Sequence, residues 1–167
     1  TNAGKSTLFN KLTRANAVTA DQLFATLDTT MRRLKTKKNN TIIFADTVGF
    51  INDLPHELIA AFRSTLEEIK YSELILHIID ASDKDYWQHL RYVNSVLRLL
   101  DADKIPQIRV YNKIDKIENL KPSFVNLNDS DDSLVARAYL SAETCDGIEG
   151  LFQAIAEHFN KNWLSGI

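Results

Sequence analysis

Apolar and polar residues follow one another along the chain in blocks that predict strands alternating with helices. Residues 74–79 form an almost continuous apolar run, which is typical of a strand in a parallel sheet that is covered on both faces. Strands that alternate with helices of 10 to 15 residues indicate βαβ units, so we expect a three-layer α/β fold with a mostly parallel sheet. The predicted helices cover residues 5–12, 54–70, 86–100 and 148–159, and the predicted strands cover residues 32–38, 41–44, 74–79, 108–111 and 136–140.

Composition adds that the chain is one globular domain, residues 1–167. The 167 residues are 44% hydrophobic and 25% charged, and the formal net charge of −2 creates no overall attraction to nucleic acid or to a membrane. No apolar run approaches the ~20 residues that a membrane span requires. Cys145 stands alone and cannot form an internal disulfide, which fits a reducing compartment.

The first seven residues, Thr-Asn-Ala-Gly-Lys-Ser-Thr, match the second half of the phosphate-binding pattern G-x-x-x-x-G-K-[ST]. Gly4 lets backbone N–H groups close around phosphate oxygens, Lys5 places a positive charge against them, and the hydroxyl of Ser6 can bind Mg²⁺. The first glycine of the pattern would lie two residues before Thr1. We therefore expect that this glycine and the strand before it are missing from the chain. The predicted phosphate contacts are Asn2, Ala3, Gly4, Lys5, Ser6 and Thr7.

A second candidate site follows the apolar strand 42–45. Asp46 ends that strand with a carboxylate that can hold Mg²⁺ through water, and Gly49 can offer a backbone N–H to a γ-phosphate. An aspartate after an apolar strand is often only a turn residue. Its place after the Gly-Lys-Ser loop favours the phosphate-site interpretation.

The segment Asn112-Lys113-Ile114-Asp115 selects the base. The carboxylate of Asp115 can accept two hydrogen bonds from guanine N1–H and the exocyclic amine, and adenine offers no such pair. Asn112 is expected to tie this loop to the phosphate loop, and the stem of Lys113 is expected to lie over the base. Ser141 and Ala142 follow the next strand, and by position their backbone is expected to contact the guanine oxygen.

The order and spacing of these sites resemble the Ras-type, translation-factor-class GTPases. A closer resemblance is carried by residues 1–10, 23–33, 46–51 and 53–58, which together are similar to the HflX family. The resemblance covers nearly the whole chain as that family's GTPase domain. It implies a bacterial, cytoplasmic, ribosome-associated GTPase that binds GTP or GDP with Mg²⁺ and separates stalled ribosomes by binding the large subunit, notably under heat stress. It also implies that an N-terminal RNA-contacting domain and linker helices are missing.

Two positions in the predicted switch loops bear on catalysis. A Mg²⁺-binding threonine is expected between the phosphate loop and Asp46, and Thr26, Thr29 and Thr30 are candidates. The family usually carries proline at the position of Thr29 followed by threonine, which favours Thr30. Phe50 stands where Ras-type enzymes hold the glutamine that orients the attacking water, so we expect slow intrinsic hydrolysis that depends on a partner. The predicted catalytic residues are Lys5, Thr30 and Gly49, and the predicted metal ligands are Ser6, Thr30 and Asp46.

Two features of the sequence each allow two interpretations. Asn2 resembles the asparagine that binds K⁺ beside the phosphates in the potassium-dependent GTPases, and it can equally serve only as a loop cap. A basic patch next to the switch either solvates a sheet edge or contacts rRNA, and the salt dependence of ribosome binding would tell the two apart. This patch consists of Arg32, Arg33, Lys35, Lys37 and Lys38.

Three functions are therefore compatible with the sequence. The first is a GTP-hydrolysing switch that acts on the ribosome. The second is a nucleotide-dependent binding module in which hydrolysis is incidental, an alternative that Phe50 supports. The third is an inert fragment, because loss of the first strand would leave ladder hydrogen bonds unsatisfied and weaken or abolish nucleotide binding.

Overall fold

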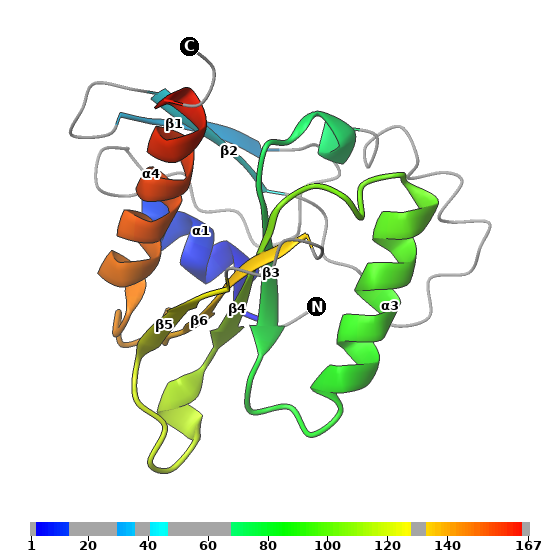
Figure 1. The fold of residues 1–167 in the computed structure, drawn as a ribbon. Helices are drawn as coiled ribbons and strands as arrows, with labels where there is room; N and C mark the ends of the chain where they lie inside the picture. The colour runs from blue at the N-terminus through cyan, green and yellow to red at the C-terminus, as the bar shows by residue number, and fades with distance from the viewer. Residues whose placement is uncertain (1–2, 14–29, 36–40, 47–67, 128–132, 165–167) are drawn as a thin grey trace.

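The computed structural model describes residues 3–13, 30–35, 41–46, 68–127 and 133–164. Figure 1 shows the chain as a ribbon, with these ranges drawn in colour. The described elements are α1 (Lys5–Thr13), β1 (Thr30–Lys35), β2 (Thr41–Asp46), the 3-10 helix η1 (Glu68–Tyr71), β3 (Ile75–Asp80), α3 (Tyr86–Leu99), β4 (Gln107–Asn112), the 3-10 helix η2 (Ile114–Lys116), β5 (Ser123–Asn126), β6 (Leu134–Tyr139) and α4 (Ile148–Leu164).

The strands form two sheets. The larger has the order β3-β4-β6-β5, in which β3, β4 and β6 are parallel and β5 runs antiparallel to β6. The smaller is the antiparallel pair β1–β2, in which Thr30 lies opposite Asp46. Because β3, β4 and β6 are parallel, the polar residues that follow them meet at one edge of the larger sheet.

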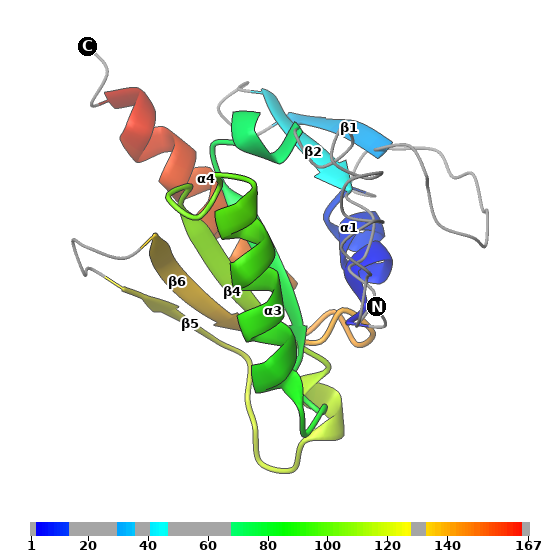
Figure 2. The same cartoon turned by 90° about the vertical axis from the view of Figure 1, so that its right-hand side faces the viewer.

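Helices cover both faces of the larger sheet, with α1 and α4 on one side and α3 on the other (Figures 1 and 2). Alternation along each strand explains the two faces. Ile108 and Val110 of β4 pack in the core shared with α1 and α4, whereas Tyr111 packs with Leu90 of α3. The expected three-layer α/β fold is therefore confirmed.

The helices are amphipathic, as their sequence periodicity predicts. Leu90, Val96 and Leu97 of α3 are buried, while Arg91 and Arg98 on the same helix are exposed. No helix in the described ranges combines the length and the apolar character that a membrane crossing requires.

Several elements differ from the sequence expectation. The strand β5 (Ser123–Asn126) was not predicted, because only the half-buried Phe124 contributes an inward apolar side chain. Of the helix predicted over residues 54–70, only the end lies in the described ranges, and there the chain forms the 3-10 helix η1. The expected helix 148–159 extends further, to Leu164.

Candidate nucleotide-binding site

The predicted site residues that the structure describes gather at the carboxyl ends of the parallel strands. Asn112 is the last residue of β4, and Ser141 follows β6 by two positions. Gly4 directly precedes α1. In Figure 2 the loop near residue 145, drawn in orange, passes beside the start of α1. The sheet therefore brings three loops together that are far apart in the sequence.

The side chain of Asn112 joins these three loops. It is buried, with 2% of its surface exposed. Its Nδ2 donates a hydrogen bond to the carbonyl oxygen of Ala3 at 2.8 Å, and its Oδ1 accepts one from the backbone N–H of Ala142 at 2.8 Å. The predicted tie between this loop and the phosphate loop is therefore present. We call these two hydrogen bonds the Asn112 junction.

Gly4 is required by its backbone and by its neighbour. Its φ of +81° lies in the left-handed region that favours glycine. A Cβ at this position would lie 2.3 Å from Nδ2 of Asn112, closer than atoms can approach. Any side chain here would displace the Asn112 junction, so the glycine serves the protein's own packing as well as a close approach of phosphate.

Lys5 and Asp46 bring the start of α1 and the end of β2 into contact. The ammonium of Lys5 forms an ion pair with Oδ1 of Asp46. Ser6 and Thr7 are exposed in the first turn of α1, and Thr30 lies opposite Asp46 in the backbone register of β1 and β2. The residues predicted to face phosphate and metal thus lie on adjoining elements.

The donor set at this place fits a magnesium ion that binds together with a nucleotide. No group of three or more His, Cys, Asp and Glu residues able to hold a metal occurs within the described ranges. Mg²⁺ at phosphoryl-transfer sites takes one or two protein oxygens and fills its other positions with phosphates and water. The hydroxyl of Ser6 and the carboxylate of Asp46 are oxygens of this kind.

Asp115 and Lys113 occupy the loop after β4. The carboxylate Oδ1 of Asp115 accepts a hydrogen bond from the hydroxyl of Ser141 at 2.5 Å, while the side chain as a whole is exposed. Lys113 has a φ of +66°, and its ammonium donates to Oδ2 of Asp80 at 2.6 Å. Asp115 is thus positioned from the next loop, with its carboxylate open to a ligand.

Asp80 was missed by the sequence analysis. It ends the strand β3 in the same way that Asp46 ends β2, so the rule that selected Asp46 could have selected Asp80 as well.

Seven of the positions that the sequence analysis singled out lie outside the described ranges. They are Asn2, Thr26, Thr29, Lys37, Lys38, Gly49 and Phe50.

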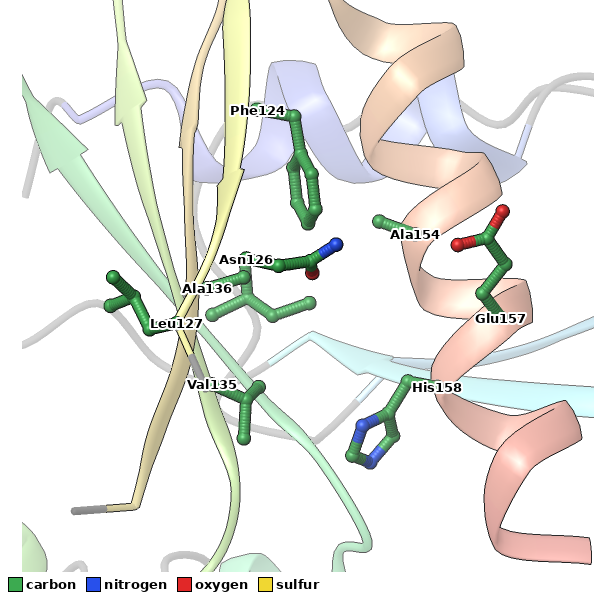
Figure 3. A pocket seen from close by; sticks show the side chains of 9 residues that line it. Phe124, Asn126, Leu127, Val135, Ala136, Ala154, Glu157 and His158 are labelled. Atoms are coloured by element: carbon green, nitrogen blue, oxygen red, sulfur yellow. The ribbon is translucent and has the colours of Figure 1, made fainter. Parts of the chain in front are cut away.

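A separate cavity of about 140 Å³ lies between the β5–β6 strands and α4. In Figure 3, Phe124 and Val135 reach it from the sheet side, and Ala154 and His158 reach it from α4. Among the described residues, none of those predicted to contact nucleotide lines this cavity, which borders the amino end of β6 rather than its carboxyl end. It is therefore distinct from the candidate site.

The arrangement defines the class of protein. A Gly-Lys-Ser loop that opens a helix, joined through a buried asparagine to an Asn-Lys-x-Asp loop at the end of a parallel strand, is the architecture of a P-loop GTPase domain.

Comparisons with known proteins agree with this class and narrow it. The family described as "50S ribosome-binding GTPase" matches residues 1–113. GTPase HflX of Escherichia coli (strain K12) is 47% identical over 160 residues, which cover 96% of this chain and 37% of that protein. GTPase HflX of Caldanaerobacter subterraneus subsp. tengcongensis is 46% identical over 161 residues, which cover 96% of this chain and 35% of that protein.

A solved structure shows the same fold at lower identity. It is a GTP-binding protein from the hyperthermophilic archaeon Sulfolobus solfataricus in complex with GDP, with a TM-score of 0.69 and 26% identity over 94% of this chain and 49% of that one. The chain belongs to the HflX family of GTPases. It spans about a third of the length of the curated relatives described above, which these alignments cover to 37% and 35%.

Proposed function

We propose that residues 1–167 act as one GTP-binding and GTP-hydrolysing switch domain of a ribosome-associated GTPase. The observation that carries this proposal is the Asn112 junction, because it holds the phosphate loop, the Asn-Lys-x-Asp loop and the Ser141 loop in one hydrogen-bonded unit. A ligand that spans these loops must present phosphates at one end and a flat base at the other. A guanine nucleotide has this shape.

Recognition of guanine falls to Asp115. Its hydrogen bond with the hydroxyl of Ser141 restrains one carboxylate oxygen, and the exposed carboxylate can accept the N1–H and amine hydrogens of guanine. Lys113 would cover the base with its stem, and the backbone of Ser141 and Ala142 would contact the guanine oxygen. An adenine base would leave the carboxylate without donors, which gives the site its preference.

At the phosphate end, Lys5 must exchange partners. Its ammonium, paired with Asp46 in this structure, would move to the β- and γ-phosphates when GTP binds. That movement releases the Asp46 carboxylate for the water shell of Mg²⁺. Ser6 and Thr30 would bind the ion directly, and the ion would neutralise the charge that develops as water attacks and GDP and phosphate are formed.

Hydrolysis by the isolated domain is expected to be slow. Phe50 cannot donate or accept a hydrogen bond and therefore cannot orient water as glutamine does. A partner could supply the missing element, since stimulation in trans reaches ~10³–10⁵-fold in comparable systems. The description of the matched family, 50S ribosome-binding GTPase, favours the large ribosomal subunit as that partner. Ribosome splitting in the cytoplasm as the outcome rests on the resemblance to the HflX family alone. K⁺ bound through Asn2 would be a second source of positive charge; the alternative is that Asn2 only caps the loop.

Phe50 also supports a second candidate function, a nucleotide-dependent binding module with incidental hydrolysis. Turnover measured with and without 50S subunits and K⁺ separates the two. Strong stimulation by 50S subunits supports the enzyme. Tight binding of GTP with no stimulated turnover supports the binding module, and absence of any nucleotide binding by this chain supports an inert piece.

The base assignment is tested by Asp115→Asn. Calorimetry should show that affinity falls for GDP and rises for the xanthine nucleotide XDP, because the amide can donate to the xanthine oxygen that replaces the guanine amine. Glu118→Gln removes an exposed carboxylate three residues further on and should leave the preference for GDP unchanged. A preference for GDP that survives in Asp115→Asn would refute the assignment.

A further inference from the structure

Asp80 lies at the same edge of the sheet as the candidate nucleotide site, and neither the sequence motifs nor the comparisons assign it a role. It is the last residue of β3, directly opposite Asn112 in the parallel register with β4. The backbone N–H of Ala81 donates to the carbonyl oxygen of Asn112 at 2.9 Å, which fixes the end of β3 against the loop that carries Lys113.

Each carboxylate oxygen of Asp80 has its own partners. Oδ1 accepts hydrogen bonds from the backbone N–H of Ser82 at 3.0 Å and from its hydroxyl at 2.6 Å. Oδ2 accepts from the ammonium of Lys113 at 2.6 Å. One oxygen is thus anchored to the loop before α3, and the other is left for Lys113.

The charge on Asp80 is maintained in this setting. Partial burial by itself raises the pKa of the Asp80 carboxyl, but the hydrogen bonds from Lys113 and Ser82 outweigh it and hold the pKa below its ordinary value. The carboxylate is therefore ionised at neutral pH. Both side chains of the pair are mostly shielded from solvent, with 21% of Asp80 and 23% of Lys113 exposed.

The contact determines the direction of the Lys113 side chain. Lys113 adopts a left-handed backbone conformation, with φ at +66°, and its Cε lies 4.0 Å from the position of a Cβ built on Gly4. The stem therefore runs from the loop after β4, past the phosphate loop, to the end of β3. A free lysine stem samples many rotamers and loses that freedom when it packs against a ligand. A stem that is already held in place loses less.

We propose that Asp80 is a positioning residue for guanine-nucleotide binding, which holds the Lys113 ammonium so that its stem forms one wall of the base pocket before the ligand arrives. This inference rests on the proposed nucleotide site. The simpler alternative is that Asp80 only orders the turn before α3 through Ser82. The positioning role predicts that removal of the Asp80 charge weakens nucleotide binding only when Lys113 is present. The turn-ordering role predicts the same effect on binding with or without Lys113.

A double-mutant cycle tests the difference. The affinity for GDP is measured by titration with a fluorescent GDP analogue for the unchanged chain, Asp80→Asn, Lys113→Met and the variant with both changes. We expect Asp80→Asn to weaken binding roughly tenfold when Lys113 is present, because a charge-assisted hydrogen bond is lost. In the Lys113→Met background we expect Asp80→Asn to change affinity by less than about twofold, since no coupling remains.

Asp83→Asn is the matched control. Asp83 is a second carboxylate of the loop between β3 and α3, where it accepts from the backbone N–H of Asp85 at 2.9 Å and pairs with His89 at 3.2 Å. Its carboxylate forms no hydrogen bond or ion pair with Lys113, which pairs with Asp80 instead, so affinity for GDP should stay within about twofold of the unchanged chain.

The outcomes distinguish failure of the positioning role of Asp80 from failure of the proposed nucleotide site. If Asp80→Asn weakens binding equally in both backgrounds, or does not weaken it at all, the positioning role is refuted while the nucleotide site stands. If the unchanged chain binds no GDP, both the site and the positioning role fail. Should Asp80→Asn not fold, Ser82→Ala replaces it. This change removes the hydroxyl, one of the two donors that anchor Oδ1. It should weaken binding only where Lys113 is present, and an equal effect in both backgrounds would overturn the proposal.

Discussion

The Asn112 junction permits a quantitative prediction about stability. Replacing Asn112 with alanine removes both of its hydrogen bonds and leaves the backbone N–H of Ala142 buried without its partner, since Ala142 is only 2% exposed. Each hydrogen bond contributes about 1 kcal/mol, and a buried donor left unsatisfied costs a further ~1–3 kcal/mol. We therefore expect the free energy of unfolding of Asn112→Ala to fall by about 3–5 kcal/mol.

Urea denaturation followed by circular dichroism measures this change. With a slope of ~2 kcal/mol per molar urea, the midpoint should shift by roughly 1.5–2.5 M while the slope stays constant. Asn94→Ala removes the same amide from the half-buried position 94 on α3 and should change stability by less than ~0.5 kcal/mol. A loss below ~1 kcal/mol in Asn112→Ala would refute the reasoning, because even the two hydrogen bonds alone exceed that value.

Two further predictions concern a buried histidine and a glycine. Burial, assisted by the charge of Arg109, lowers the pKa of His77 from 6.5 to about 4. Between these pH values the unfolded chain takes up a proton that the folded chain excludes. The free energy of unfolding therefore falls as the pH drops from 6.5 toward 4. Urea midpoints at pH 7 and pH 5 should therefore differ less in His77→Leu than in the unchanged chain, and an undiminished difference would contradict this origin. Gly4→Ala should abolish GDP binding, because its Cβ would displace Asn112, whereas Gly150→Ala, with no atom within 4 Å of the added Cβ, should bind GDP normally. GDP binding retained by Gly4→Ala would show that the loop can relax around the methyl group.

Sequence patterns predicted the elements whose apolar spacing is strong. The helix expected over residues 86–100 is α3, which ends one residue earlier, and the apolar run 74–79 gives β3 with a shift of one residue. These elements are encoded locally, since each carries enough inward side chains to define its own face. The strand β5 is different: its four residues acquire strand structure by pairing with β6, a tertiary interaction that local sequence does not reveal.

The candidate site likewise combines contacts that the sequence predicts with contacts that depend on the tertiary structure. The Asn-Lys-x-Asp motif predicted that Asn112 would tie its loop to the phosphate loop, and Nδ2 of Asn112 donates to the carbonyl oxygen of Ala3 although 109 positions separate the two residues. The ionic partners were not predictable in this way. Lys5 pairs with Asp46, and Lys113 pairs with Asp80, because each ammonium selects among several carboxylates by distance and direction. Such choices depend on three-dimensional geometry and leave no periodic signal in the sequence.

The antiparallel strand β5 has a consequence for association between molecules. An edge strand carries unpaired backbone N–H and C=O groups that another chain can use to extend the sheet, and Val125 adds an apolar side chain that is 46% exposed. β5 is only four residues long, and Lys121 and Pro122 directly precede it. A charge and a residue without an N–H at this place discourage a foreign strand from extending the pairing. Resistance to aggregation at this edge thus depends on the strand remaining short.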